Sequence, residues 1–214
     1  MQGLKALAFE AFCKEKNLSF TRFDYNGHGM SEGQFEQGDI GSWADDALAI
    51  FDHIAHKYSR VIIIGSSMGA WIATLIAKQR ASRLAGLITL AAAPDFTEIL
   101  LLPSLSDEQR TVLNNGGTIH LPTRYDDSPY PVSANLINNS KAHTVLDKPF
   151  TLSVPVRLIH GTSDMDVPHE MSSRLMETIQ SDDTILTLIK NSDHRLSTES
   201  ELKTITQIIQ SILP

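Results

Sequence analysis

Apolar residues recur along the chain in two periods, one typical of helices and the other of buried strands. Helical spacing predicts helices over residues 4–16 and 69–80. It predicts three more that begin after Gly41-Ser42, near Pro168 and at Thr198, the last of which runs to the end of the chain. At the last of these, Thr198 and Glu201 have the spacing of a capping box. Short apolar runs predict strands at 19–24, 60–65, 85–92, 155–160 and 184–189. Strands that alternate with helices favour βαβ crossovers, so we expect an α/β protein with a mostly parallel sheet covered on both faces.

Residues 95–150 interrupt this alternation. They contain five of the nine prolines, an Asn114–Gly117 turn and a short helix signal at Ser106 and Gln109. A connection of this length between two strands is uncommon as plain loop. The apolar run 99–102, Tyr125 and Tyr130 need a packing partner, so a disordered linker fits poorly. We interpret 95–150 as a lid or cap insertion over the carboxyl end of the sheet, within one domain of 1–214.

Composition narrows the class of partner. The chain has 214 residues and a formal net charge of −7, and no basic patch offsets that charge, which argues against binding to nucleic acid or anionic membranes. No apolar stretch is long enough to span a bilayer. A single cysteine, Cys13, excludes an intramolecular disulfide and indicates a reducing compartment. Cys13 lies on a helical face with Phe9 and Phe12, so we interpret it as a small buried apolar residue. The first residues show no cleavable signal, and a cytoplasmic location is expected.

The most informative motif is Gly65-Ser66-Ser67-Met68-Gly69. It follows the apolar run 61–64 and precedes the helical pattern that starts at Ala70. This G-x-S-x-G pattern between a strand and a helix is typical of a nucleophile elbow, a tight turn that projects a serine hydroxyl from the end of a sheet. A glycine-rich turn without chemistry is the alternative. The sequence therefore predicts Ser67 as a nucleophile, provided that its partners are present.

A serine nucleophile needs a general base, and the base needs an orienting acid. On this type of fold both follow the serine, each at the end of a later strand. Asp164 follows strand 155–160 and His194 follows strand 184–189, which predicts these residues as acid and base. Asp166 is the other candidate acid, but we expect it to cap the helix near Pro168. For Asp193 we expect only hydrogen bonding within its turn.

No catalytic role is predicted for the remaining histidines. His28, His160 and His169 are interpreted as turn or strand-end residues. No spacing among the eight histidines and Cys13 indicates a metal site, so none is predicted.

Several segments together resemble the α/β-hydrolase family. They are 23–33 (FDYNGHGMSEG), 65–69 (GSSMG), 160–168 (H-G-x-x-D-x-x-V-P) and 192–197 (SDHRLS). Within the family the chain is most similar to the branch of the mitochondrial palmitoyl-protein thioesterase, which also cleaves acyl glucuronides, and its bacterial relatives. The resemblance runs through nearly the whole chain and implies a three-layer α/β-hydrolase fold.

The resemblance also implies a function. It implies hydrolysis of a small acyl ester or thioester through an acyl-enzyme on Ser67, with His194 as base and then acid and Asp164 holding the imidazole. The backbone N–H of Met68 would be one oxyanion donor, and no cofactor is implied. A serine at this position argues against dehalogenase and epoxide-hydrolase relatives, whose nucleophile is a carboxylate. Peptidases, lipases, carbon–carbon hydrolases and acyltransferases use the same triad, so the exact substrate does not follow.

The chain departs from the family pattern at its beginning. Relatives place two or three strands before the first helix, and the loop after the third supplies the second oxyanion donor. Here Met1-Gln2-Gly3 lead directly into a helix, so we expect an amino-terminally truncated form or a misassigned start. Strand 19–24 would alternatively pair with strand 60–65 in a smaller sheet. The predicted function is a serine esterase or thioesterase; the alternative is a catalytically impaired hydrolase-fold protein that acts as a binding module. No pattern indicates the oligomeric state.

Overall fold

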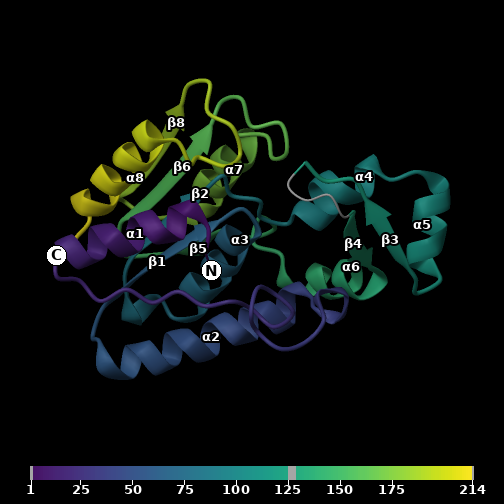
Figure 1. Cartoon of the computed structure of the whole chain (residues 1–214), viewed down its shortest axis with the longest axis horizontal. Coiled ribbons are helices and arrows are strands. Elements are labelled where there is room, and N and C mark those ends of the chain that lie inside the picture. Colours follow the sequence, from purple (N-terminus) through teal and green to yellow (C-terminus); the bar gives the residue numbers. More distant parts are fainter. Residues whose placement is uncertain (1, 125–128, 214) are drawn as a thin grey trace. The chain divides into compact units, whose positions relative to one another are not determined.

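The computed structural model describes residues 2–124 and 129–213 (Figure 1). The chain divides into two compact units. The first comprises Met1–Phe23, Ala47–Pro94 and Val145–Pro214, and the second comprises Asp24–Asp46 and Asp95–Thr144. Tyr125, used above for the lid, and the starting residue Met1 lie outside the described residues. The interpretation of 95–150 as a lid within one domain stays a prediction.

The first unit is built on a parallel four-stranded sheet. Its order is β1-β2-β6-β8, formed by Val61–Ser66, Leu84–Leu90, Val156–Gly161 and Thr184–Ile189. All residues of β2 and β6 are buried. In β2 this agrees with a nearly continuous apolar sequence, whereas β6 also buries Arg157 and His160. A separate pair of short parallel strands, β5 (Phe150–Thr151) and β7 (Ile179–Gln180), lies in the same unit. The parallel sheet predicted from the alternation of elements is thus confirmed.

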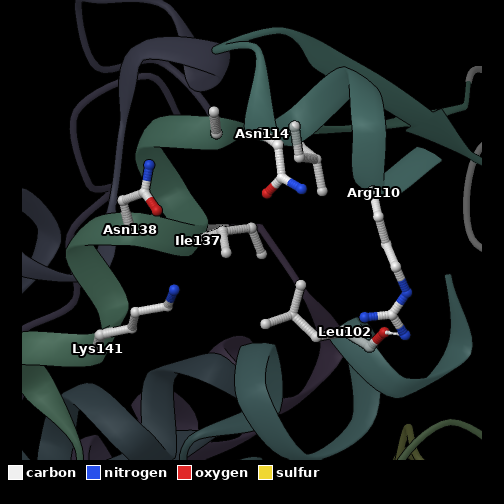
Figure 2. Close-up of a pocket in the computed structure, with 8 residues that line it drawn as sticks. Leu102, Arg110, Asn114, Ile137, Asn138 and Lys141 are labelled. Carbon is white, nitrogen blue, oxygen red and sulfur yellow. Dashed lines mark hydrogen bonds between the residues drawn. The ribbon is translucent and has the colours of Figure 1, made fainter. Parts of the chain in front are cut away.

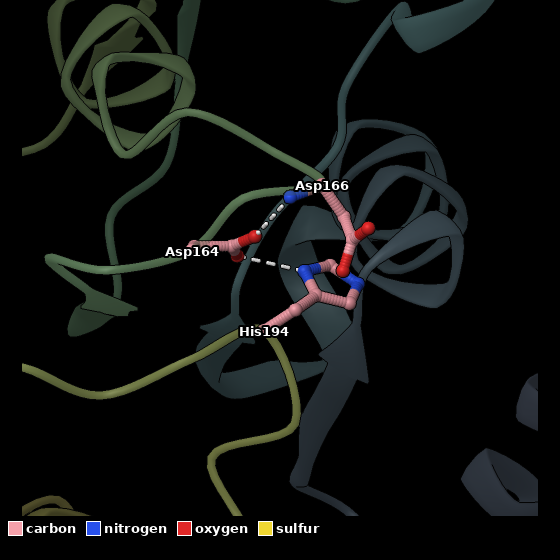
Figure 3. Close-up of side chains that lie close together, drawn as sticks. All are labelled: Asp164, Asp166 and His194. Carbon is pink, nitrogen blue, oxygen red and sulfur yellow. Dashed lines mark hydrogen bonds and ion pairs between the residues drawn. The ribbon is translucent and has the colours of Figure 1, made fainter. Parts of the chain in front are cut away.

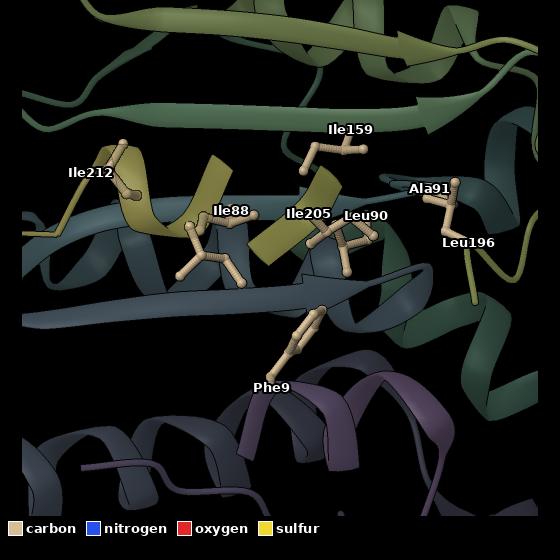
Figure 4. Packing of buried hydrophobic residues seen from close by; sticks show 9 residues of the cluster. Phe9, Ile88, Leu90, Ala91, Ile159, Leu196, Ile205 and Ile212 are labelled. Carbon is tan, nitrogen blue, oxygen red and sulfur yellow. The ribbon is translucent and has the colours of Figure 1, made fainter. Parts of the chain in front are cut away.

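Helices cover both faces of this sheet. α1 (Leu4–Glu15) and α8 (Glu199–Ser211) pack on one face, and α3 (Met68–Gln79) packs against β1 and β2 on the other (Figure 1). α7 (Glu170–Thr178) contacts β6 and β8, and η2 (Ala81–Arg83) leads into β2. Figure 4 shows the core between the sheet and α1 and α8, formed by Phe9, Ile88, Leu90, Ile159, Leu196, Ile205 and Ile212, among others. Each of these large side chains contributes about 1.5–3 kcal/mol on burial. The predicted capping box of α8 is present in full, with Thr198 and Glu201 exchanging both hydrogen bonds.

One predicted strand is wrong. Residues 19–24 form no strand; instead Arg22 pairs with Glu10 at 2.8 Å, and Ser19 Oγ donates to the Tyr58 hydroxyl at 2.7 Å. A strand exists only through hydrogen bonds to a neighbouring strand. β1 is an edge of the sheet, and no backbone hydrogen bond joins 19–24 to it, so the alternative pairing of 19–24 with 60–65 is also wrong. Ile62, Ile63 and Ile64 along this edge remain only half-buried.

The second unit is mainly helical. Its helices and turns are η1 (Phe35–Gln37), η3 (Thr97–Leu101), α4 (Leu102–Ser104), α5 (Asp107–Asn114), α6 (Ala134–Ser140) and η4 (Lys141–His143). β3 (Thr118–Leu121) and β4 (Tyr130–Ser133) form an antiparallel pair. The predicted Ser106–Gln109 capping box is present at the start of α5. α2 (Ile40–Lys57) begins in this unit and ends in the first.

Two further predictions concern Cys13 and the absence of membrane-spanning helices. Cys13 is buried in α1, and burial raises the pKa of its thiol above the usual value, which suits an unreactive packing role. Across the described part of the chain, no helix is both long and apolar enough to cross a membrane.

Candidate active site

Ser67 lies between the end of β1 and the start of α3, as the pentapeptide predicts. Its backbone has φ 56° and ψ −123°, a strained conformation for a residue with a side chain. The turn is tight because Gly65 has no Cβ: one built there would lie 2.6 Å from the carbonyl carbon of Gly69 and 2.7 Å from Cα of Ala70. The Ser67 N–H donates to the Leu90 carbonyl on β2 at 2.9 Å, which fixes the turn to the sheet.

His194 lies in the loop after β8. This loop runs close to the end of β6, where the Ser163 N–H donates to the Ser192 carbonyl at 2.9 Å. A Cβ on Gly161 would lie 2.6 Å from the Ser192 carbonyl carbon, so glycine is needed at the end of β6 for the loop to approach. On the other side, the Lys5 ammonium on α1 donates to the carbonyl of Arg195. The loop is thus held from two sides around His194.

Asp164 follows β6, and its carboxylate is almost fully buried, with 1% of the side chain exposed. Oδ1 accepts the N–H groups of Asp166 at 2.9 Å and Val167 at 2.8 Å. Oδ2 contacts His194 Nδ1 at 2.7 Å and His160 Nε2 at 3.1 Å. Burial alone would raise the pKa of this carboxyl, but hydrogen bonds from His160, His194 and the Val167 N–H outweigh it and hold the pKa well below its usual value. Asp164 is therefore an ionised acceptor near neutral pH.

The structure brings the three predicted side chains into one hydrogen-bonded chain. His194 Nε2 lies 2.9 Å from Ser67 Oγ, and its Nδ1 lies 2.7 Å from Asp164 Oδ2. Figure 3 shows the Asp164 carboxylate directed at the near side of the imidazole. With Nδ1–H donating to the carboxylate, Nε2 is left as the acceptor that faces the serine hydroxyl. This arrangement can take a proton from Ser67.

His160 is a residue whose contribution was missed from the sequence. It was interpreted as a strand-end residue, but its side chain is fully buried and lies beside Asp164. Nε2 is 3.1 Å from Asp164 Oδ2 and 3.0 Å from the Val167 carbonyl oxygen, while Nδ1 is 2.7 Å from Ser172 Oγ. Because both neighbours of Nε2 are acceptors, the neutral ring carries its proton on Nε2 and accepts the Ser172 hydroxyl at Nδ1. The spacing of His160 and Asp164, four residues apart, was the signal available in the sequence.

Asp166 is not the N-cap residue of the following helix, contrary to expectation. The N-cap residue of α7 is His169, and its side chain makes no capping hydrogen bond. A carboxylate oxygen of Asp166 lies within 4.8 Å of a ring nitrogen of His194, and Figure 3 shows the two side chains close together. Single ligand atoms of Asp164, Asp166 and His194 lie within 4.8 Å of one another, a grouping able to hold a metal ion. Both nitrogens of His194 are already hydrogen-bonded to Asp164 and Ser67, so a metal ion bound through His194 would have to displace one of these contacts.

Two further predicted positions lie beside the triad. Asp193 accepts the Arg195 N–H at 2.9 Å, so its expected hydrogen bonding within the turn is confirmed. Met68 is the first residue of α3, and the N–H of a first helical residue has no partner within its own helix. That N–H is available next to Ser67.

Comparisons with known proteins identify the family. The family model Hydrolase_4, described as serine aminopeptidase, S33, matches residues 8–121, more than half of the chain. The human palmitoyl-protein thioesterase ABHD10, mitochondrial, is 32% identical over 214 residues, covering 100% of this chain and 69% of that protein. The structure of alpha/beta hydrolase domain-containing protein 10 from mouse superposes with a TM-score of 0.89 at 32% identity, covering 99% of this chain and 84% of that one. The chain belongs to the α/β-hydrolase family.

A bacterial relative extends the agreement. The crystal structure of a protein described as a hydrolase from Agrobacterium vitis S4 matches with a TM-score of 0.95 and 33% identity, over 100% of this chain and 84% of that one. The resemblance inferred from the motifs is therefore confirmed, and so is the α/β-hydrolase fold with its mostly parallel central sheet. Relatives named as thioesterases and hydrolases support hydrolase activity for this α/β-hydrolase.

Proposed function

We propose that the protein is a serine hydrolase that cleaves carboxylic esters or thioesters through an acyl-enzyme on Ser67. The observation that carries this proposal is the unbroken hydrogen-bonded chain from Ser67 Oγ through His194 to Asp164, with contacts of 2.9 and 2.7 Å. An isolated serine hydroxyl is a weak nucleophile near neutral pH, and a base oriented by a buried carboxylate is the arrangement that activates it.

Each side chain then has one task. Ser67 Oγ attacks the acyl carbonyl carbon while its proton passes to His194 Nε2. The imidazolium formed is stabilised by Asp164, which stays ionised because its pKa is lowered by the surrounding donors. When the carbon–oxygen or carbon–sulfur bond breaks, Nε2 gives that proton to the leaving alcohol or thiol. Water activated by the same nitrogen then attacks the acyl-enzyme, which releases the acid and restores Ser67.

The negative charge on the former carbonyl oxygen needs a donor beside Ser67. The N–H of Met68 supports this role, since it is the residue after the nucleophile and begins α3. The positive end of the helix dipole adds to the stabilisation. Loss of one oxyanion donor typically costs about a hundred- to a thousandfold in turnover, so this single N–H matters to the rate.

The substrate class rests on the relatives. The human relative is named as a palmitoyl-protein thioesterase, so we propose that acyl esters and thioesters are the substrates of this chain also. A cytoplasmic location stays a proposal based on the single cysteine, whereas the human relative is named as mitochondrial. Cell fractionation with an antibody to the protein tests the location directly.

Active-site labelling tests the chemistry. The purified protein is treated with a fluorophosphonate probe and, separately, assayed on a panel of short- and long-chain p-nitrophenyl esters and acyl thioesters. We expect labelling and turnover in the wild type and in Ser163→Ala, a matched control because its hydroxyl is exposed in the acid loop and makes no hydrogen bond among the described residues. Ser67→Ala should lose the label entirely and lower kcat by about ten-thousandfold or more.

Two results decide between this proposal and its alternative. A folded wild type that is never labelled, or a Ser67→Ala variant that retains full turnover, would overturn the hydrolase proposal. In the first case the hydrolase-fold binding module becomes the better interpretation. Titration of the wild type with a non-hydrolysable ether analogue of the ester substrate would then measure binding without turnover.

A further inference from the structure

The second unit contains a cavity that the proposed chemistry does not use. It lies between α5 and α6, has a volume of about 280 Å³ and is bordered at one side by Leu102 of α4 (Figure 2). At about 30 Å³ for each water molecule in the liquid, this volume corresponds to about nine waters. It is therefore large enough to hold a small ligand.

The polar groups of this cavity carry positive charge or neutral amides. They come from Arg110, Asn114, Asn138 and Lys141, and no lining residue is acidic. Figure 2 shows the Lys141 ammonium and the Asn114 amide directed toward the interior from opposite sides. No hydrogen bond or ion pair to any described residue involves the side chains of Asn114, Asn138 or Lys141. In a chain with a formal net charge of −7, a cavity with two cations and no carboxylate selects an anion.

Arg110 is held in place at the border of the cavity. Its Nε donates to the Leu105 carbonyl at 3.2 Å, and Nη2 donates to the Leu102 carbonyl. These two bonds fix the plane of the guanidinium and leave the Nη1 donors without a partner among the described residues. A fixed guanidinium loses little conformational entropy when it binds a carboxylate.

The remaining wall is apolar. Leu113 and Ile137 are buried, with 6% and 5% of their surfaces exposed, and Leu102 lies between the ends of the two helices. Figure 2 shows Ile137 and Leu102 between the cations Lys141 and Arg110, so apolar surface adjoins each cation. A positive group next to leucine and isoleucine suits a ligand with one anionic end and one hydrocarbon end.

We infer that this cavity binds a small carboxylate that bears an aliphatic chain, with the carboxylate at Lys141 and the chain against Leu113 and Ile137, while Arg110 at the opposite border adds to the positive charge of the cavity. The residues that line this cavity all belong to the second unit, whereas Ser67, Asp164 and His194 belong to the first. The inference therefore stands independently of the proposed hydrolase activity.

Isothermal titration of the full chain with octanoate tests the site. We expect a dissociation constant of about 1 mM or tighter, given the small size of the ligand. Acetate has the head group alone and 1-octanol the chain alone, and each should bind at least about tenfold more weakly than octanoate. Lys141→Gln should weaken octanoate binding about three- to fivefold, as for one exposed charge pair. Lys148→Gln, a matched control on an exposed lysine of the first unit, should leave it unchanged.

A second variant tests the location without touching a buried residue. Asn138 is exposed at the rim, so Asn138→Trp should fold normally, as checked by circular dichroism, and block the entrance. Binding of octanoate should then fall below detection. The inference is overturned if octanoate does not bind up to about 10 mM, if 1-octanol binds as tightly, or if Lys141→Gln and Asn138→Trp bind octanoate as the wild type does. The last result would place octanoate elsewhere on the protein.

Discussion

Replacing His160 by phenylalanine removes three buried polar contacts while keeping a ring of similar size. The substitution leaves the Ser172 hydroxyl and the Val167 carbonyl without their partner, and both groups lie in the interior around a side chain that is fully buried. Asp164 loses one of the two donors to Oδ2 but keeps His194 and two backbone N–H groups. The substitution should therefore lower the free energy of unfolding and loosen the position of the Asp164 side chain.

The size of the effect follows from the groups left unpaired. Each buried polar group without a partner costs about 1–3 kcal/mol, so two cost about 2–6 kcal/mol. Taking about 3 kcal/mol as a working value, the melting temperature should fall by roughly 6–12 °C for a chain of this length. His160→Gln keeps an amide donor and an acceptor in the same region, and we expect it to lose less than half as much.

Thermal unfolding of the wild type and both variants measures this difference in stability. A double-mutant cycle with Ser172→Ala then tests how much of it comes from the contact between His160 and Ser172. Ser172→Ala alone leaves His160 Nδ1 without its donor. If the 2.7 Å contact between them is the cause, the two single changes should couple by about 1–2 kcal/mol. A His160→Phe protein within about 0.5 kcal/mol of the wild type would refute this account of the buried histidine.

Three further outcomes follow from the same geometry. The difference in unfolding free energy between the wild type and Asp164→Asn should be constant above about pH 5 and shrink below about pH 4. The reason is that a carboxyl whose pKa is lowered in the folded state stabilises the fold only while it is ionised. Urea unfolding at a series of pH values measures this difference, and a difference that grows in acid would contradict the prediction. Gly65→Ala should cost about 1–3 kcal/mol and slow fluorophosphonate labelling of Ser67, since the new Cβ meets backbone atoms. Gly3→Ala is its control, because a Cβ there meets nothing within 4 Å, and equal effects of the two would rule the explanation out. Thr198→Ala should cost about 1 kcal/mol by removing one half of the α8 capping box, and Thr198→Ser should restore it in a melting experiment.

The site residues were predictable from sequence where their positions follow from the strands that precede them. Ser67, Asp164 and His194 each follow a strand of a parallel sheet, and parallel strands bring their carboxyl ends to one edge. The contribution of His160 was not predictable in this way, because the same residue at a strand end is inert unless an acceptor and a hydroxyl pack beside it. The placement of Asp166 was predicted incorrectly for a similar reason. A capping role was assigned from its distance along the chain, whereas His169 is the N-cap residue and an Asp166 oxygen lies within 4.8 Å of a His194 nitrogen.

The fold was predictable where elements depend on their own sequence. Helices α5 and α8 begin at the predicted capping boxes, and β8 spans the predicted residues 184–189. The segment 19–24 shows the limit, since its phenylalanines and threonine favour a strand but a strand forms only against a neighbour. β3 and β4 were missed because they are four residues each, too short for their period to stand out.

The edge position of β1 has a consequence for the behaviour of the protein in solution. Among the described residues β1 pairs with a strand on one side only, and three of its isoleucines are only half-buried. Unpaired edge strands can form hydrogen bonds with extended segments of other molecules, and natural proteins usually prevent this with charged residues or proline in the edge strand. Neither stands among residues 61–66. Self-association should therefore rise with protein concentration, and dilute samples at low temperature are the appropriate form in which to study this chain.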